Sequence, residues 1–208
     1  MTRTRTKICG LTRPLDAVIA ADLGADAIGL VFYDKSPRNV SVQQAEEILS
    51  ALPAFITSVG LFLDPSAEHV EKISSSLSLD CLQFHGAESH EFISQFRLPY
   101  IKAIGMQGDV SVVDSMAAYP DSLGYLLDSH ASGEAGGSGV TFNWDDIPSS
   151  LRSMMIVAGG ITANNVGECI ARIRPYAVDV SSGVESAPGL KDKGKMEKLF
   201  MAIRQADD

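Results

Sequence analysis

Eight short β-rich segments alternate with eight amphipathic segments along the chain, and this alternation restricts the possible folds more than any other feature. Apolar runs of strand length predict strands at residues 5–11, 27–32, 57–63, 81–86, 100–105, 124–129, 155–160 and 177–183. The intervening helical patterns predict helices at 14–23, 42–52, 66–77, 88–96, 110–118, 144–151, 163–173 and 192–204. Such strict alternation requires parallel strands that are joined by helical crossovers.

The even spacing of these units predicts a closed (β/α)₈ TIM barrel that forms a single domain over residues 1–208. Each unit has about 26 residues, which is close to the minimum for a closed barrel of this kind. A doubly wound open sheet is the alternative, but it rarely contains eight such even units. One long segment, 129–143, carries four glycines and is expected to be either an active-site lid or a plain surface loop: Gly133, Gly136, Gly137 and Gly139.

The acidic composition argues against several classes of protein. Lys and Arg number 17 and Asp and Glu number 26, so the net charge of −9 does not favour a nucleic-acid surface. The apolar runs are shorter than a membrane span, and no signal-peptide pattern follows the first residues. Cys9, Cys81 and Cys169 are odd in number and widely spaced, which favours neither a disulfide framework nor a zinc ribbon. We therefore expect a cytoplasmic protein with no nucleic-acid or membrane partner.

Alternation along each strand also predicts which side chains face the barrel axis. Val178 and Val180 are apolar and should face helices, so Asp179 and Ser181 should point inward. The same reasoning places a polar set inside the barrel: Lys7, Cys9, Gln83, His85, Lys102, Asp128, Asp179 and Ser181. A purely structural interior would contain branched aliphatic residues, and buried ionisable groups are costly unless paired. The set therefore predicts a functional site, and a structural ion network is the alternative for Lys7, Lys102 and Asp179.

Two glycine-rich segments end the seventh and eighth predicted strands. Gly159 and Gly160 follow the seventh strand, and Ser181, Ser182 and Gly183 follow the eighth. In (β/α)₈ barrels a phosphate commonly binds between these two loops, on backbone N–H groups and at the start of a short extra helix. We expect that helix at residues 184–188. The chain is therefore predicted to bind a small phosphorylated substrate.

Several motifs resemble those of the phosphoribosylanthranilate isomerase family, in order and over the whole chain. They are Lys7-Ile8-Cys9-Gly10, Ser36-Pro37-Arg38, Leu82-Gln83-Phe84-His85-Gly86, Gly136-Gly137-Ser138-Gly139, Ala158-Gly159-Gly160-Ile161 and Asp179-Val180-Ser181-Ser182-Gly183-Val184-Glu185. The first and the last of these are the most specific. Phe84, Val140 and Asn143 depart slightly from the family pattern and leave the expected catalytic pair in place.

The resemblance implies an Amadori rearrangement of N-(5-phosphoribosyl)anthranilate in tryptophan biosynthesis. By the family pattern, Asp128 is the general acid that opens the furanose ring, and Cys9 is the general base at ribose C2. Arg38 is expected to bind the anthranilate carboxylate in a bidentate fork. His85, Asp179 and the two glycine-rich loops are expected to bind substrate. The resemblance implies no cofactor and no metal.

The proton transfers set two physical requirements. A free thiol has a pKa of about 8.5, so a cysteine base benefits from a nearby cation such as Lys7. Asp128 must hold a proton to act as an acid, and we expect desolvation under a closed lid to favour that form. The open alternatives are the related sugar isomerase of histidine biosynthesis and a non-catalytic phosphate-binding barrel. A monomer is slightly favoured over a homodimer.

Overall fold

The computed structural model describes residues 3–130 and 141–208, and within them eight parallel strands close into a barrel. The strands follow one another around the barrel in sequence order, and β8 pairs with β1. They are β1 (Arg5–Cys9), β2 (Ala27–Val31), β3 (Thr57–Phe62), β4 (Cys81–Phe84), β5 (Tyr100–Gly105), β6 (Gly124–Asp128), β7 (Met155–Val157) and β8 (Ala177–Val180). The predicted closed (β/α)₈ barrel is confirmed, and the open sheet is excluded.

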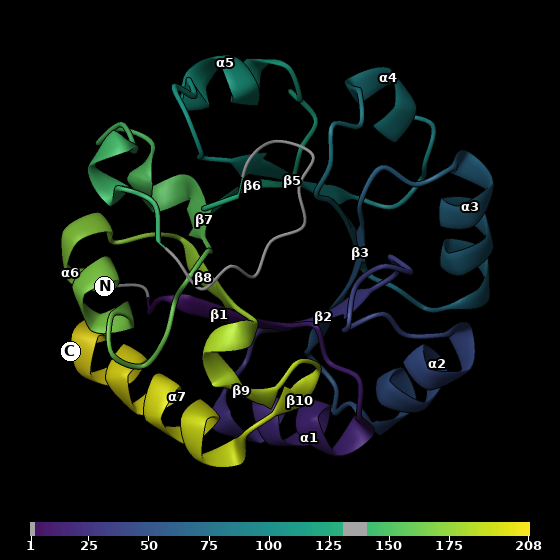
Figure 1. Cartoon of the computed structure of the whole chain (residues 1–208), viewed down its shortest axis with the longest axis horizontal. Helices are drawn as coiled ribbons and strands as arrows, with labels where there is room; N and C mark the ends of the chain where they lie inside the picture. Colours follow the sequence, from purple (N-terminus) through teal and green to yellow (C-terminus); the bar gives the residue numbers. More distant parts are fainter. Residues whose placement is uncertain (1–2, 131–140) are drawn as a thin grey trace.

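Helices surround the barrel as an outer layer (Figure 1). They are α1 (Pro14–Leu23), α2 (Val42–Ala51), α3 (Ala67–Ser76), α4 (His90–Ile93), α5 (Val112–Ala117), α6 (Val166–Ile173) and α7 (Lys193–Asp207). Serines begin several of them, as Ser41 does for α2 by accepting a hydrogen bond from the Gln44 N–H, 3.2 Å away. None of the helices in these described ranges is long and apolar enough to cross a membrane.

The predicted helix at 144–151 is wrong, because this segment holds one short 3₁₀ turn and a second one follows it. These turns are η1 (Trp144–Asp146) and η2 (Arg152–Met154). Pro148 gives the physical reason, since the residue before a proline is driven out of the helical region. Ile147, which precedes it, is extended with φ −79° and ψ 116°.

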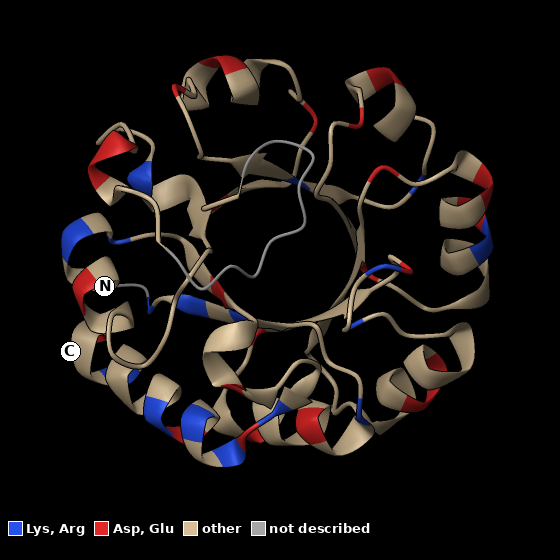
Figure 2. Cartoon of the chain, viewed as in Figure 1, with Lys and Arg blue, Asp and Glu red and all other residues tan. Residues whose placement is uncertain are grey.

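Apolar side chains form two separate cores. The larger one lies between the strands and the helices, and it includes Ile8, Leu82 and Val178. The smaller one fills the barrel interior and consists of Ala103, Leu126, Ile156, Ala158 and Ala177, with Ile101 packed against it. Charged side chains lie mostly on the outer helices and connecting loops, and few lie on the strands (Figure 2).

Lys102 lies on the outside of the barrel, and its predicted inward position is wrong. Ala103 belongs to the interior cluster, and Ile104, which shares a face with Lys102, belongs to the outer core. The Lys102 ammonium is 2.9 Å from Glu88 Oε2 and 5.3 Å from the centre of the Tyr119 ring. The structural ion network proposed as the alternative for this residue is therefore correct, although it lies under the helix layer.

The segment after β8 differs from the predicted helix at 184–188. A 3₁₀ turn, η3 (Ser182–Val184), begins and ends earlier. The chain then forms an antiparallel hairpin of β9 (Glu185–Ala187) and β10 (Leu190–Lys191) before α7. Gly189, with φ +80°, provides the left-handed residue that the hairpin turn requires. The four glycines of the proposed lid, Gly133, Gly136, Gly137 and Gly139, lie outside the described residues.

Candidate active site

A pocket at the carboxyl ends of the strands is lined by every residue that was predicted to be catalytic or to bind substrate. Active sites of (β/α)₈ barrels are found at this end. The predicted residues that line it are Cys9, Arg38, His85, Asp128, Gly159, Gly160, Asp179, Ser181, Ser182 and Gly183. Gln83 lines it too, as its predicted inward direction requires. Side chains from six strands or the loops that follow them therefore converge on one cavity.

Cys9 is buried at the end of β1 beside an ion pair. Lys7 and Asp179 are direct neighbours in the register of β1 and β8, and the Lys7 ammonium lies 3.0 and 3.1 Å from the two Asp179 oxygens. Burial lowers the pKa of Lys7, but the Asp179 carboxylate and the Cys9 sulfur outweigh it, so the net pKa is above its ordinary value. Burial raises the pKa of the Cys9 thiol, and the Lys7 charge opposes that rise. Lys7 thus provides the cation that a cysteine base requires.

Gly29 leaves room for the Cys9 sulfur and the Lys7 ammonium. It was not predicted from the sequence as a site residue. In the β1–β2 register it lies opposite Cys9. A Cβ atom at Gly29 would be 2.7 Å from the Cys9 sulfur and 3.0 Å from the Lys7 ammonium. A glycine in the middle of an apolar strand often marks such a close approach, so the segment Ala27–Val31 did carry a signal.

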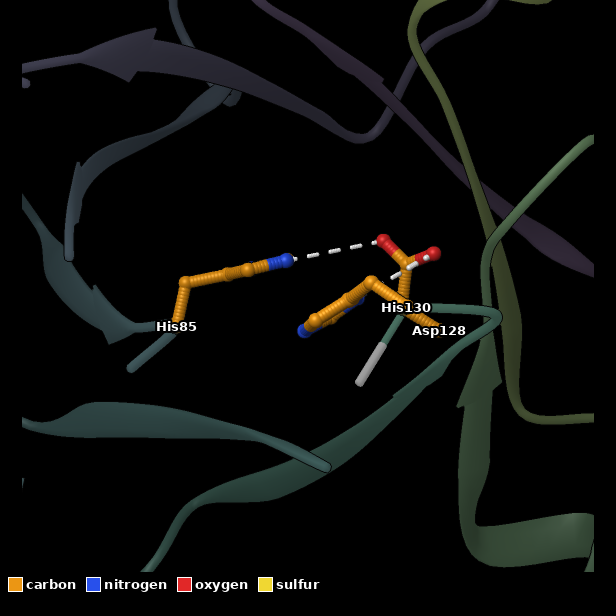
Figure 3. Close-up of side chains that lie close together, drawn as sticks. All are labelled: His85, Asp128 and His130. Atoms are coloured by element: carbon orange, nitrogen blue, oxygen red, sulfur yellow. Dashed lines mark ion pairs between the residues drawn. The ribbon is translucent and has the colours of Figure 1, made fainter. Parts of the chain in front are cut away.

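Asp128 ends β6 with two imidazole rings beside its carboxylate (Figure 3). His85 Nε2 lies 3.6 Å from Oδ2, and His130 Nδ1 lies 3.5 Å from Oδ1. The Ser129 backbone N–H donates a hydrogen bond of 2.7 Å to Oδ1. Burial raises the pKa of Asp128, but the two histidines and the Ser129 N–H outweigh it and lower the net pKa. Burial alone therefore does not keep Asp128 protonated in this arrangement, and the effect of a closed lid on its pKa stays a prediction.

His85 and His130 stack on each other with ring centres 4.3 Å apart and an interplanar angle of 20°. Burial, together with the neighbouring His130, lowers the pKa of His85 to about 3, so the His85 ring is neutral near pH 7. Gln83 Nε2 is 3.2 Å from His85 Nδ1. The sequence reasoning missed His130, because it follows β6 in a segment without periodicity.

Arg38 reaches the pocket from the segment after β2, and its fork is held by Glu185. Its Nε and Nη2 atoms donate hydrogen bonds of 2.8 and 2.7 Å to the two Glu185 oxygens. Lys191 Nζ lies 2.8 Å from the same carboxylate. Burial raises the pKa of Glu185, but these two cations outweigh it and lower the net pKa. Glu185 stood in a quoted motif, but its contact with Arg38 was not predicted.

The two predicted glycine-rich loops face the pocket from β7 and β8. Gly159 and Gly160 both have left-handed backbone, with φ +75° and +64°. A Cβ at Gly159 would lie 2.8 Å from Asp128 Oδ1, so this glycine also makes room for the carboxylate. A Cβ at Gly183 would collide with the Ile161 carbonyl, so Gly183 lets the two loops pack against each other.

An apolar wall completes the pocket on the side of β2 and β3. It consists of Val31, Tyr33, Leu61 and Leu63. None of these was predicted as a site residue, since apolar side chains at strand ends look like ordinary core positions in a sequence. The pocket therefore combines an apolar wall, a guanidinium, a thiol, a carboxylate and two glycine-rich loops.

Comparison with known proteins agrees with this geometry. A family model described as N-(5'-phosphoribosyl)anthranilate (PRA) isomerase matches residues 6–202. The chain belongs to this family. The N-(5'-phosphoribosyl)anthranilate isomerase of Halorhodospira halophila is 50% identical over 206 residues, which cover 99% of each chain. That of Pseudomonas paraeruginosa is 48% identical over 98% of this chain and 97% of its own.

Solved structures show the same fold. The phosphoribosyl anthranilate isomerase of Thermus thermophilus has a TM-score of 0.85 and 36% identity over 97% of this chain and 99% of its own. Another phosphoribosyl anthranilate isomerase was solved with reduced 1-(o-carboxyphenylamino)-1-deoxyribulose 5-phosphate bound. Its TM-score is 0.82, with 35% identity over 97% of this chain and 99% of its own. The resemblance stated from the motifs is thereby confirmed.

Proposed function

We propose that this enzyme isomerises N-(5-phosphoribosyl)anthranilate to 1-(2-carboxyphenylamino)-1-deoxyribulose 5-phosphate in tryptophan biosynthesis, with Asp128 as acid and Cys9 as base. The observation that carries the assignment of the two groups is their position. A carboxyl group and a thiol line one pocket, whose other walls are two glycine-rich loops and an arginine. The remaining polar groups suit the two charged ends of this substrate.

The first step needs a proton at the furanose ring oxygen. The Asp128 carboxyl donates it, the bond between C1 and the ring oxygen breaks, and the nitrogen lone pair forms a protonated Schiff base at C1. The two histidines and the Ser129 N–H lower the pKa of Asp128, so its carboxylate must gain a proton as substrate enters. A substrate that brings a phosphate and a carboxylate raises the pKa of Asp128 by like-charge repulsion and by expelling water.

The second step removes the proton from C2. The Cys9 thiolate accepts it, and the electrons of the C–H bond flow into the Schiff base to give an enolamine. The enolamine then gains a proton at C1 and loses one from the C2 hydroxyl, which leaves the ketone. One carbon is oxidised while its neighbour is reduced, so the reaction balances without an external oxidant. Lys7 favours the thiolate, because its charge opposes the effect of burial on the Cys9 pKa.

In the proposed complex, the groups that bind the phosphate and those that bind the anthranilate lie on opposite sides of Asp128 and Cys9. The loops at Gly159–Gly160 and Ser181–Gly183 receive the phosphate on their backbone N–H groups. Val31, Tyr33, Leu61 and Leu63 receive the anthranilate ring. Arg38 binds the ring carboxylate either with the part of its guanidinium that Glu185 leaves free or by exchanging Glu185 for substrate.

Turnover of phosphoribosylanthranilate, followed by anthranilate fluorescence, tests this function directly. The histidine-pathway substrate, run alongside, tests the related isomerase, and no turnover of either would leave a non-catalytic binding barrel. Cys9→Ser and Asp128→Asn should each lower kcat by about 10²–10⁴-fold, as expected for a general base and a general acid. Both variants should still bind a product analogue. A folded Cys9→Ser enzyme within tenfold of wild type would contradict the assignment of the base.

Three further properties remain predictions. We propose a cytoplasmic location, a single catalytic domain over residues 1–208, and a monomer in preference to a homodimer. Sedimentation of the purified protein measures the oligomeric state.

A further inference from the structure

Lys191, at the end of β10, is a buried lysine that was not predicted as a site residue and that the proposed reaction does not use. Its side chain is fully buried, although it is not one of the described residues that line the pocket. Its ammonium donates hydrogen bonds of 2.8 Å to Glu185 Oε1 and 3.1 Å to the Ser181 carbonyl. The Ser181 hydroxyl oxygen lies 3.4 Å from the same ammonium. One buried charge therefore contacts both the carboxylate that holds Arg38 and a loop that is proposed to bind phosphate.

The backbone of Lys191 is fixed to the start of α1. Asp16 Oδ2 accepts a hydrogen bond of 3.2 Å from the Lys191 N–H, and Arg13 Nη2 donates one of 3.2 Å to the Lys191 carbonyl. Arg13 and Asp16 also pair with each other at 2.8 Å. At the turn of the same hairpin, the Thr12 hydroxyl donates a hydrogen bond of 2.5 Å to the Gly189 carbonyl. The β9–β10 hairpin is thus bound to the segment after β1, and the Lys191 ammonium extends from a fixed backbone.

Stability does not by itself account for this lysine. Burial lowers the pKa of Lys191, and the Glu185 carboxylate offsets this only in part, so the charged form is held at a cost. A buried ion pair often stabilises a fold no more than apolar side chains of the same volume. We propose that Lys191 is a positioning residue for both charged ends of the substrate, because it holds the carboxylate that orients Arg38 and the loop at Ser181.

The two contacts of the Lys191 ammonium act on different ends of the substrate. Glu185 accepts from Nε and Nη2 of Arg38, so a fixed carboxylate also fixes the plane of the guanidinium. The two ends meet at Gly10, where a Cβ would collide with the Arg38 side chain and lie 3.0 Å from Ser181 Oγ. Loss of Lys191 should therefore weaken substrate binding more than it slows the chemical step. The identity of the substrate rests on the proposed function, whereas binding of phosphate can be measured without turnover.

Calorimetric titrations with two probes test this role. Inorganic phosphate tests the Ser181 loop alone, and reduced 1-(o-carboxyphenylamino)-1-deoxyribulose 5-phosphate, the product analogue, tests both ends. Lys191→Met should bind phosphate about tenfold more weakly and should lose more affinity for the analogue, because charge-assisted contacts that order both ends are lost. In turnover, KM should rise while kcat stays within a few-fold of wild type. Since the Lys191 charge also lowers the pKa of Cys9, kcat is compared on the upper plateau of its pH profile.

Three further variants separate positioning from a loss of stability. Lys102→Met breaks a buried lysine–carboxylate pair outside the barrel, so it should lose stability yet bind both probes like wild type. Lys191→Met/Glu185→Gln leaves no buried carboxylate unpaired, so it should recover stability without recovering affinity for phosphate. Arg38→Lys should bind the analogue more weakly and phosphate like wild type, because it changes only the end that binds the carboxylate.

Four outcomes would overturn the positioning role. They are a wild type that binds no phosphate, wild-type phosphate affinity in folded Lys191→Met, a loss for the analogue no larger than that for phosphate, and recovery of phosphate affinity together with stability in the double variant. If Lys191→Met does not fold, the double variant is compared with Glu185→Gln, from which it differs only at Lys191. A wild type that binds both probes but does not turn over phosphoribosylanthranilate would instead contradict the proposed function, and the phosphate titrations would still test Lys191.

Discussion

Two buried lysine–carboxylate pairs lie on opposite sides of the barrel wall. Lys7 and Asp179 pair inside, next to Cys9, with the ammonium 3.0 Å from the nearer oxygen. Lys102 and Glu88 pair outside, under the helix layer, at 2.9 Å. Both ammonium groups are buried, so the chemistry and the burial of the pairs are alike. Their side of the strand decides whether the charge acts on Cys9, the proposed base, or holds a loop in place.

Breaking the inner pair should have the largest effect, because it affects both activity and stability. Lys7→Met leaves the buried Asp179 carboxylate without its partner, which should lower the free energy of unfolding by about 3–5 kcal/mol. The Cys9 thiol also loses the charge that opposes its raised pKa. We expect kcat/KM to fall on the order of 100-fold at neutral pH.

The pH profile identifies the cause of this loss. Activity that depends on the Cys9 thiolate rises as pH passes the thiol pKa. Removal of the Lys7 charge raises that pKa further, so the rise in the kcat/KM profile of Lys7→Met should move to higher pH. A profile that is scaled down but not displaced would contradict the role of Lys7 in activating the thiol.

Breaking the outer pair should affect stability alone. Lys102→Met strands the Glu88 carboxylate and removes a donor from the carbonyls of Phe84 and Gly86. Urea unfolding should show a loss of about 3–5 kcal/mol, with kcat within a few-fold of wild type. The double variant Lys102→Met/Glu88→Gln should recover part of the loss, because the neutral amide that replaces the carboxylate leaves no buried charge unpaired. A large kcat defect in well-folded Lys102→Met would remove the distinction between the two pairs.

Two glycines, one inside and one outside the barrel wall, test the same comparison with smaller expected effects. Gly29→Ala places a methyl group 2.7 Å from the Cys9 sulfur, whereas Gly60→Ala places one 2.7 Å from Leu79 Cδ1 in the outer core. Each substitution overpacks its surroundings and should cost about 1–3 kcal/mol of stability. Only Gly29→Ala should lower kcat, since it displaces the thiol. Equal kcat values for the two variants would show that the position of the Cys9 sulfur is not critical.

The sequence predicted the barrel and the side chains at its mouth wherever alternation was unambiguous. Val178 and Val180 have a charged residue between them, so the inward direction of Asp179 could be read directly. Residues 101–104 of β5 have apolar side chains on both faces, and the small Ala103 is the one that faces the crowded interior. The alternation of polar and apolar residues does not show which face of β5 points into the barrel, because it records polarity and not the space available.

Other features of the site depend on contacts that no local pattern encodes. His130 follows β6 without periodicity, yet it stacks on His85 from another strand. The fork of Arg38 is satisfied by Glu185, which is 147 residues away in the sequence. The pKa of Asp128 depends on such neighbours as well, because the two histidines and the Ser129 N–H outweigh the effect of burial. Residue types at strand ends can be inferred from sequence, whereas their partners require the fold.

The smallest expected effect on activity concerns a third group of ion pairs, in which the buried Glu185 carboxylate lies between Arg38 and Lys191. The Glu185 carboxylate accepts two hydrogen bonds from Arg38, one from Lys191 and one from the Gly189 N–H, so it orients the guanidinium and bonds neither the thiol nor Asp128. Glu185→Gln keeps the shape and one acceptor oxygen but removes the charge that pairs with the buried Lys191, so stability should fall as well, while the contact that orients Arg38 weakens by about 1 kcal/mol. KM should therefore rise about fivefold while kcat changes little, because 1.4 kcal/mol corresponds to about tenfold in affinity. Steady-state kinetics of Glu185→Gln, with Arg38→Lys as the matched variant that keeps the charge but loses the planar fork, measure this split. A fall in kcat at unchanged KM would instead place Glu185 among the groups that act on the reacting atoms.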